Sequence, residues 1–121
     1  MSNELILAVK QGEELNRGFT IKAGGNALDL SDYTVRFQVK RVPLENSPSI
    51  IDKEITTVSD DNIVGRINNP QQGQFFVHLT KEDTSFAPSD YSLIISLEAD
   101  NFIDIISSKC CNKAIYKICQ Q

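Results

Sequence analysis

The residues best suited to catalysis in this 121-residue chain are its single histidine, His78, and three cysteines near the C-terminus, Cys110, Cys111 and Cys119. Nucleophilic catalysis by serine or cysteine needs a base beside the nucleophile, and only His78 offers an imidazole. His78 lies in the alternating run 74–80, opposite the apolar positions, so we expect a solvent-facing or interface residue. No G-x-S-x-G motif is present. The sequence therefore predicts that the protein is not an enzyme.

The cysteines do not form a convincing metal site or disulfide framework. A structural zinc site uses about four ligands in spaced pairs, a spacing that Cys110, Cys111, Cys119 and His78 do not provide. Adjacent cysteines rarely bridge each other, and an odd number leaves one thiol over. We therefore expect reduced thiols that pack as small hydrophobic groups, and no metal or other cofactor.

The acidic residues are better explained by solvent exposure and turns than by acid–base chemistry. Adjacent carboxylates occur at three places, Glu13–Glu14, Asp60–Asp61 and Glu82–Asp83. All three lie in turn-like segments, whereas general acid catalysis needs a carboxyl group that is desolvated inside a cleft. The oxygens of Asp29, Ser31 and Asp32 would suit calcium, but hydrogen bonds within a turn account for these residue types more simply.

Length and charge limit the classes of protein and partner. A chain of this length forms one domain, residues 1–121, and a composition of 40% hydrophobic and 23% charged residues is ordinary for a globular protein. A net charge of −4 repels phosphate backbones and anionic lipids, which argues against nucleic acid and membrane partners. The opening residues lack the basic region of a signal peptide, and no apolar run is long enough for a transmembrane helix. We expect a protein that is made in the cytoplasm and stays soluble.

Short strands are the elements that would position all of these residues. In the run 33–40, Tyr33, Val35, Phe37 and Val39 alternate with polar residues, which predicts a strand with one face in the core. The polar positions of this run would form a solvent-exposed or docking face. The two glycines before it, 24–25, predict a turn.

Further strands are predicted along the rest of the chain, at 19–23, 49–58, 63–67, 74–80, 91–99, 101–107 and 113–119. Residues 1–11 would form either a docking arm or a first strand. Turn residues recur every roughly eight to twelve positions, and no segment has the pattern of an amphipathic helix. This pattern predicts an all-β fold, an immunoglobulin-like antiparallel β-sandwich of about seven or eight strands, in which Tyr91 occupies the position of a tyrosine corner.

Apolar residues on the outer faces of the predicted strands suggest that the protein binds a partner. Phe76 and Ile94 both lie opposite the core-facing positions of their strands, which suggests burial against a terminal arm or another subunit. Arg36 lies on the polar face of its strand, where it would be either solvated or part of a rim that contacts an acidic partner. The predicted interface residues are Leu5, Ile6, Leu7, Val9, Arg36, Phe76, Ile94, Cys110, Cys111 and Cys119.

Two longer segments resemble a known family. They are "GFTIKAGGNALDLSDYTVRFQVKR" and "GQFFVHLTKEDTSFAPSDYSLIISLE", and within them Asp29–Val35 and Val77–Tyr91 carry the likeness. The sequence from Gly12 to Glu98 resembles the immunoglobulin-like N-terminal domain of tailed-phage baseplate upper proteins and related small virion proteins. Ser89 replaces the glycine expected before Asp90, which alters the turn there.

The resemblance implies a non-enzymatic structural protein of the virion, assembled in the cytoplasm of the host bacterium. Its partners would be other virion proteins of the capsid, fibre or baseplate, with self-association as a further option. Baseplate upper proteins continue into a helical stalk that this sequence lacks, which favours a capsid-surface decoration protein or a fibre-anchoring adaptor over a baseplate or tail adaptor. A carbohydrate-binding sandwich is an alternative of another class, but the chain has no tryptophan and only three tyrosines to form a sugar-binding row.

Overall fold

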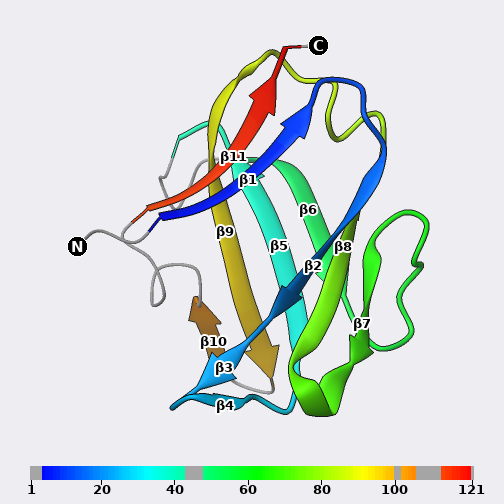
Figure 1. Ribbon diagram of the computed structural model, residues 1–121, viewed down its shortest axis with the longest axis vertical. Helices are drawn as coiled ribbons and strands as arrows, with labels where there is room; N and C mark the ends of the chain where they lie inside the picture. The colour runs from blue at the N-terminus through cyan, green and yellow to red at the C-terminus, as the bar shows by residue number, and fades with distance from the viewer. Residues whose placement is uncertain (1–3, 43–47, 100–101, 106–112, 121) are drawn as a thin grey trace.

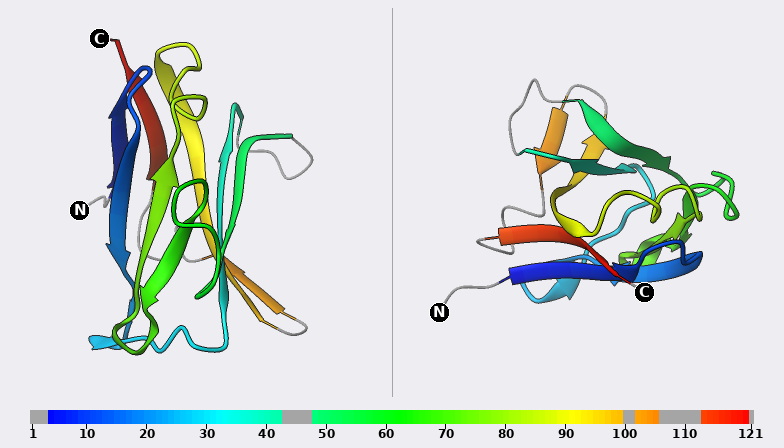
Figure 2. Two further views of the ribbon diagram at one scale, coloured as in Figure 1. Left: turned by 90° about the vertical axis from the view of Figure 1, so that its right-hand side faces the viewer. Right: turned by 90° about the horizontal axis from the view of Figure 1, so that it is seen from above.

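The chain folds as a β-sandwich of two packed sheets, which confirms the predicted all-β sandwich (Figures 1 and 2). A computed structural model describes residues 4–42, 48–99, 102–105 and 113–120. Within these residues the only helix is a single 3₁₀ turn, Pro70–Gln72. None of the helical structure in this part of the chain could cross a membrane.

The larger sheet has six strands and the smaller has three. The larger is ordered β1 (Glu4–Lys10), β11 (Lys113–Cys119), β9 (Ser89–Ala99), β5 (Thr34–Lys40) and β6 (Ser49–Ile55), with β10 (Phe102–Ile105) paired to β9. The smaller is ordered β2 (Leu15–Thr20), β8 (Gln74–Leu79) and β7 (Gly65–Asn69). Among the described residues, all strand pairs are antiparallel except β1 with β11, so the first and last strands lie side by side in a parallel pair.

A short hairpin forms at the predicted glycine turn. The strands β3 (Lys22–Ala23) and β4 (Asn26–Ala27) flank Gly24 and Gly25, whose φ angles are 60° and 84°. Only glycine adopts such angles without a steric cost, so the turn is dictated by the local sequence. With this hairpin, the described residues contain eleven strands, more than the seven or eight predicted.

Several predicted strand boundaries are wrong, and the strand predicted at 19–23 is divided between β2 and β3. We predicted strands at 49–58 and 63–67, but β6 ends at Ile55 and β7 begins at Gly65. The hydroxyl of Ser59 accepts the amide of Thr56 and donates to the carbonyl of Gly65, which closes residues 56–64 into a loop. The loop therefore removes Val58 and Ile63 from the sheets.

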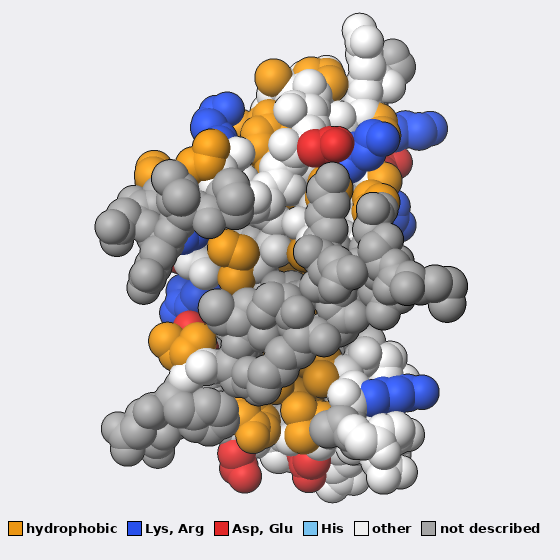
Figure 3. Space-filling model, turned by 90° about the vertical axis from the view of Figure 1, so that its left-hand side faces the viewer, with side chains coloured by type: hydrophobic (Ala, Val, Ile, Leu, Met, Phe, Trp, Pro, Cys, Tyr) orange, Lys and Arg blue, Asp and Glu red, His pale blue; other side chains and the backbone are white. Residues whose placement is uncertain are grey.

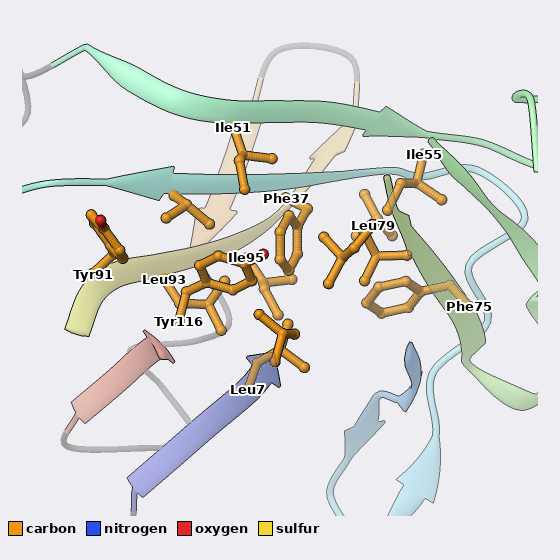
Figure 4. Close-up of a cluster of buried hydrophobic side chains, with 14 of the residues drawn as sticks. Leu7, Phe37, Ile51, Ile55, Phe75, Leu79, Tyr91, Leu93, Ile95 and Tyr116 are labelled. Atoms are coloured by element: carbon orange, nitrogen blue, oxygen red, sulfur yellow. The ribbon is translucent and has the colours of Figure 1, made fainter. Parts of the chain in front are cut away.

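The core lies between the sheets, and the alternation in β5 predicts its central residues. Val35, Phe37 and Val39 are fully buried, and Phe37 meets the ring of Tyr116 edge-on at 6.4 Å between centroids (Figure 4). Lys40 was predicted to be solvated, but it is only 8% exposed. The pairing of β5 with β6 shifts register between Val39 and Lys40, which interrupts the alternation at this end of the strand.

Tyr91, at the start of β9, fixes the segment before its strand. Its ring is 5% exposed, and its hydroxyl donates to the carbonyl of Ala87 at 2.6 Å. Replacing Tyr91 with phenylalanine keeps the packing but leaves this carbonyl without its donor. We expect the free energy of unfolding to fall by about 1 kcal/mol, measured by urea denaturation. Identical unfolding midpoints for the two proteins would show that the bond contributes nothing.

Tyr116 makes stability sensitive to alkaline pH. Burial, with a smaller contribution from the charge of Asp83, raises the pKa of Tyr116 in the folded protein. Its stabilising contribution is therefore complete below the unfolded pKa of about 10 and decreases as the pH rises above that value. We expect unfolding free energies measured by urea between about pH 8 and 11 to fall less steeply for Tyr116→Phe than for the wild type. Parallel pH profiles would contradict this expectation.

Candidate interaction surfaces

The N-terminal segment is an edge strand, and only part of it is available to a partner. Leu7 and Val9 are 5% and 2% exposed and belong to the core, so the prediction that they are interface residues is wrong. Leu5 also packs against the core, whereas Ile6 is 49% exposed. Side chains alternate along a strand, and once β1 pairs with β11 its odd-numbered residues point into the sandwich.

The backbone of β1 is open on one side only. The amide of Gln11, just after the strand, donates to the carbonyl of Cys119 in β11. The backbone N–H and C=O groups of successive residues point to opposite sides of a strand. The even-numbered residues of β1 therefore direct their N–H and C=O groups toward the free edge. One of them, the carbonyl of Ala8, accepts a hydrogen bond from the guanidinium of Arg17 at 3.1 Å. The β1 edge is therefore partly protected by β2 against addition of another strand.

The edge strand at the other side of the larger sheet, β6, is protected by a buried charge. Lys53 points inward between the core residues Ile51 and Ile55, and its ammonium lies 2.7 Å from a carboxylate oxygen of Asp83. The same ammonium donates to the carbonyl of Ile63. An inward-pointing charge on an edge strand opposes pairing with other chains. This ion pair was not predicted, although a lysine at a core-facing position of 49–55 is a signal in the sequence.

Arg36 is neutralised within its own chain. Its guanidinium lies 2.7 Å from Glu98 in β9 and 2.9 Å from Asp52 in β6, and Glu54 is 3.8 Å away. The hydrogen bond to Glu98 is the largest cause of a raised pKa of Arg36, so the side chain stays charged. One guanidinium among three carboxylates leaves this face acidic. Of the two alternatives for Arg36, a solvated residue or a rim that contacts an acidic partner, the second is wrong, because the net charge around Arg36 is negative.

The Arg36 cluster should contribute modestly to stability. Replacing Arg36 with methionine keeps most of the aliphatic contact but leaves three carboxylates beside one another. We expect a loss of about 1 kcal/mol at low salt, because the cluster is partly exposed. The loss should shrink in about 1 M salt, where charges are screened within roughly 3 Å. Arg41→Met, at an exposed arginine, is the matched control, and equal losses for the two variants would contradict a role for the cluster.

Phe76 and Ile94 do not form one docking patch. Both lie opposite the core-facing positions of their strands, as predicted, and both are half-buried. Phe76 is in β8 of the smaller sheet and Ile94 in β9 of the larger one, so they are on different layers of the sandwich. Any partner that covered one of them would therefore leave the other uncovered.

His78, which we predicted to be a solvent-facing or interface residue, is not solvent-facing. It is 9% exposed, with Nε2 2.9 Å from Glu14 and Nδ1 2.5 Å from the amide oxygen of Asn16. Pairing of β2 with β8 places Asn16 opposite His78, and only this long-range contact covers the ring. Because both ring nitrogens already contact oxygens of the chain, His78 links β8 to Asn16 in β2 and to Glu14 just before β2.

The cysteines and the Asp29 turn, which were considered as possible metal ligands, can be located only in part. Among the residues that the structure describes, no group of three or more His, Cys, Asp or Glu side chains could hold a metal ion. Cys119 is a half-buried free thiol, and Cys110 and Cys111 lie outside the described residues. Asp29 accepts hydrogen bonds from the amide and hydroxyl of Ser31, which lower the pKa of Asp29 and confirm the predicted turn.

Two strongly exposed apolar side chains are not among the predicted interface residues. Val58 is 83% exposed and Ile63 is 57% exposed, both in the loop between β6 and β7. The signal was present, since both lie beside a run of turn residues, Ser59 to Asn62, that ends strands. In Figure 3, which shows another side of the molecule, hydrophobic side chains reach the surface at several separate places around residues that are not described.

Three surface features stand out among the described residues. The exposed features are the outer face of β1, the acidic face around Arg36 and the loop 56–64. A scan against models of known protein families finds no match, and a search of curated protein sequences finds no relative.

Proposed function

We propose that this chain is a non-enzymatic, immunoglobulin-like structural protein of a tailed bacteriophage virion. In this proposal it decorates the capsid surface or anchors a fibre, and it docks onto other virion proteins. A baseplate or tail adaptor is the alternative within the same class. The proposal rests on the sequence resemblance over residues 12–98 together with the arrangement of the strands.

The strand order is the observation that carries the immunoglobulin-like part of the proposal. In the variable type of immunoglobulin domain, strands B, E and D lie in one sheet, and G, F, C and C′ lie in the other. Here β2, β8 and β7 follow the first order, and β11, β9, β5 and β6 follow the second. The hydrogen bond from Tyr91 at the start of β9 to Ala87 is the contact expected of a tyrosine corner.

The side chains favour binding over catalysis. The two ring nitrogens of the single histidine contact Glu14 and Asn16. The ion pair of Lys53 with Asp83 lies inside the sandwich. A carbohydrate-binding role gains no support from the described aromatic rings. Tyr91 and Tyr116 are buried and Tyr33 is half-buried, so they do not form an exposed row for stacking on sugars.

Purified particles of the phage that encodes this chain provide the test. We expect mass spectrometry to detect the protein in intact particles, and electron cryomicroscopy to show a sandwich of this size on the head or at a fibre base. Its copy number relative to the major capsid protein separates decoration, with many copies, from an adaptor, with few. Absence of the protein from intact particles would overturn the proposal.

A further inference from the structure

The loop 56–64 holds two large apolar side chains in a fixed, exposed position. Val58 is 83% exposed and Ile63 is 57% exposed, and the loop stands out beside β7 on the right of Figure 1. The carbonyl of Asp60 accepts the amides of Val64 and Gly65 at 2.9 and 3.0 Å, and the hydroxyl of Ser59 closes the loop onto Gly65. Hydrogen bonds therefore hold the loop in one conformation while these side chains are exposed. Binding a partner would cost little further conformational entropy.

The exposed charged side chains of this loop are carboxylates. Asp60 and Asp61 are both exposed within the loop, and the nearby Arg66 directs its guanidinium to the carbonyl of Ser59 at 3.0 Å. We call the set Val58, Asp60, Asp61 and Ile63 the acidic knob. An apolar centre flanked by carboxylates fits a surface that has an apolar centre flanked by cations.

A surface of that kind exists on the same chain, along β1 and its neighbours. Ile6 is 49% exposed on the outer face of β1, and the register with β11 places Ala8 beside Lys117. Lys10 and Lys117 are both exposed, and Arg17 extends from β2 to the carbonyl of Ala8. We call the set Ile6, Ala8, Lys10, Arg17 and Lys117 the basic patch. The register with β9 places one carboxylate, Asp90, beside Lys117, so the patch keeps a positive excess.

The knob and the patch lie on different parts of the sandwich: β1 runs across the middle of Figure 1 beside β11, whereas the loop 56–64 stands out at the right edge beside β7. A knob therefore cannot reach the patch of its own chain. We propose that a second copy of this chain is the partner, with the knob of one copy seated on the patch of the next. Val58 and Ile63 cover Ile6 and Ala8, while the two aspartates face the basic side chains.

This contact joins two different surfaces, so each bound copy leaves one free knob and one free patch. Such head-to-tail contacts generate rings where the rotation closes and filaments where it does not. The acidic and basic surfaces steer the encounter, so the association weakens as salt rises. The inference rests on the two surfaces alone and stands independently of the proposed virion function.

The first test measures the mass of the full-length protein by light scattering and analytical ultracentrifugation over a wide concentration range. We expect the average mass to rise with concentration and to fall when salt is added. Val58→Ser or Ile63→Ser should each weaken the association constant by about tenfold, because each removes one buried apolar side chain from the contact. Val42→Ser, at another side chain that is 45% exposed, is the control and should leave the association unchanged.

A mixing experiment tests whether the contact is head-to-tail. Val58→Lys places a cation on the knob and should abolish self-association, and Lys117→Glu should do the same by placing a carboxylate on the patch. Mixed together, the two variants should form a one-to-one complex, because one retains an intact patch and the other an intact knob. Circular dichroism confirms that each variant is folded. A wild type that stays monomeric up to about 1 mM, a range in which even weak contacts associate, would overturn the proposal. So would mixed variants that do not associate.

Discussion

Gly65→Ala is expected to lower the free energy of unfolding by about 4 kcal/mol, because strain and overpacking act on it together. Gly65 has a φ of 111°, and a Cβ atom there would lie 2.1 Å from the carbonyl oxygen of Phe76 and 2.8 Å from the Cα of Val77. Both neighbours are backbone atoms of β8, the central strand of the smaller sheet, so neither can move without breaking strand pairing.

Gly24→Ala is the matched control for this prediction. Gly24 also has a positive φ, 60°, but nothing lies within 4 Å of an added Cβ atom. It should therefore cost only about 1 kcal/mol, the penalty for alanine in the left-handed region. Urea denaturation of the two variants separates the steric clash from the backbone preference. Equal losses would show that the close approach of β7 to β8 does not matter.

The Gly65 variant also bears on the proposed self-association. The amide and the carbonyl of Gly65 both bind the loop, through Asp60 and Ser59, so a displaced Gly65 would displace the acidic knob. If the variant remains folded in the cold, we expect its association constant to fall together with its stability. Gly24→Ala, whose turn lies in the β3–β4 hairpin, should associate as the wild type does.

The second large effect is expected at the ion pair inside the sandwich. Asp83→Asn keeps an acceptor for the amide of Thr80, which Asp83 binds at 2.9 Å, but removes the countercharge of Lys53. Lys53 is 7% exposed. Leaving one member of a buried pair uncompensated costs about 3 kcal/mol or more. We expect this loss in the free energy of unfolding, measured by chemical denaturation.

A double-mutant cycle decides whether the loss comes from the unpaired charge. Lys53→Met with Asp83→Asn removes both charges at similar volume, and it should recover most of the stability that Asp83→Asn loses. Losses that simply add would contradict the pairing. We also expect Lys53→Met proteins to aggregate more readily, because β6 loses the inward charge that opposes pairing with other chains.

The local sequence was sufficient for several elements of the fold. The alternation in β5 and β8 has a period of two, and this period by itself sets which side chains share a face. The positive φ angles at Gly24 and Gly25 and the turn at Asp29 also follow from the residue types present. The boundaries of β6 and β7 did not follow, because the hydrogen bonds of Ser59 to Thr56 and Gly65 ended strands that the pattern extended.

The candidate interface was predictable only in part. The outward positions of Phe76 and Ile94 followed from alternation, but their separation onto two layers depends on which strands pair. The N-terminal run was apolar throughout, and only its pairing with β11 divided it into the core residues Leu7 and Val9 and the exposed Ile6. No local pattern identifies a partner strand at the other end of the chain.

The sequence by itself determined the all-β character, the inward faces of the longest strands and the glycine turn, because these depend on neighbours only a few residues away. Only the tertiary structure decided which polar side chains became buried or paired: Lys53 with Asp83, Arg36 with Glu98 and His78 with Glu14. Each of these pairs joins segments far apart in the chain. Their energies depend on burial and on distances of about 3 Å, which exist only after the sheets have packed.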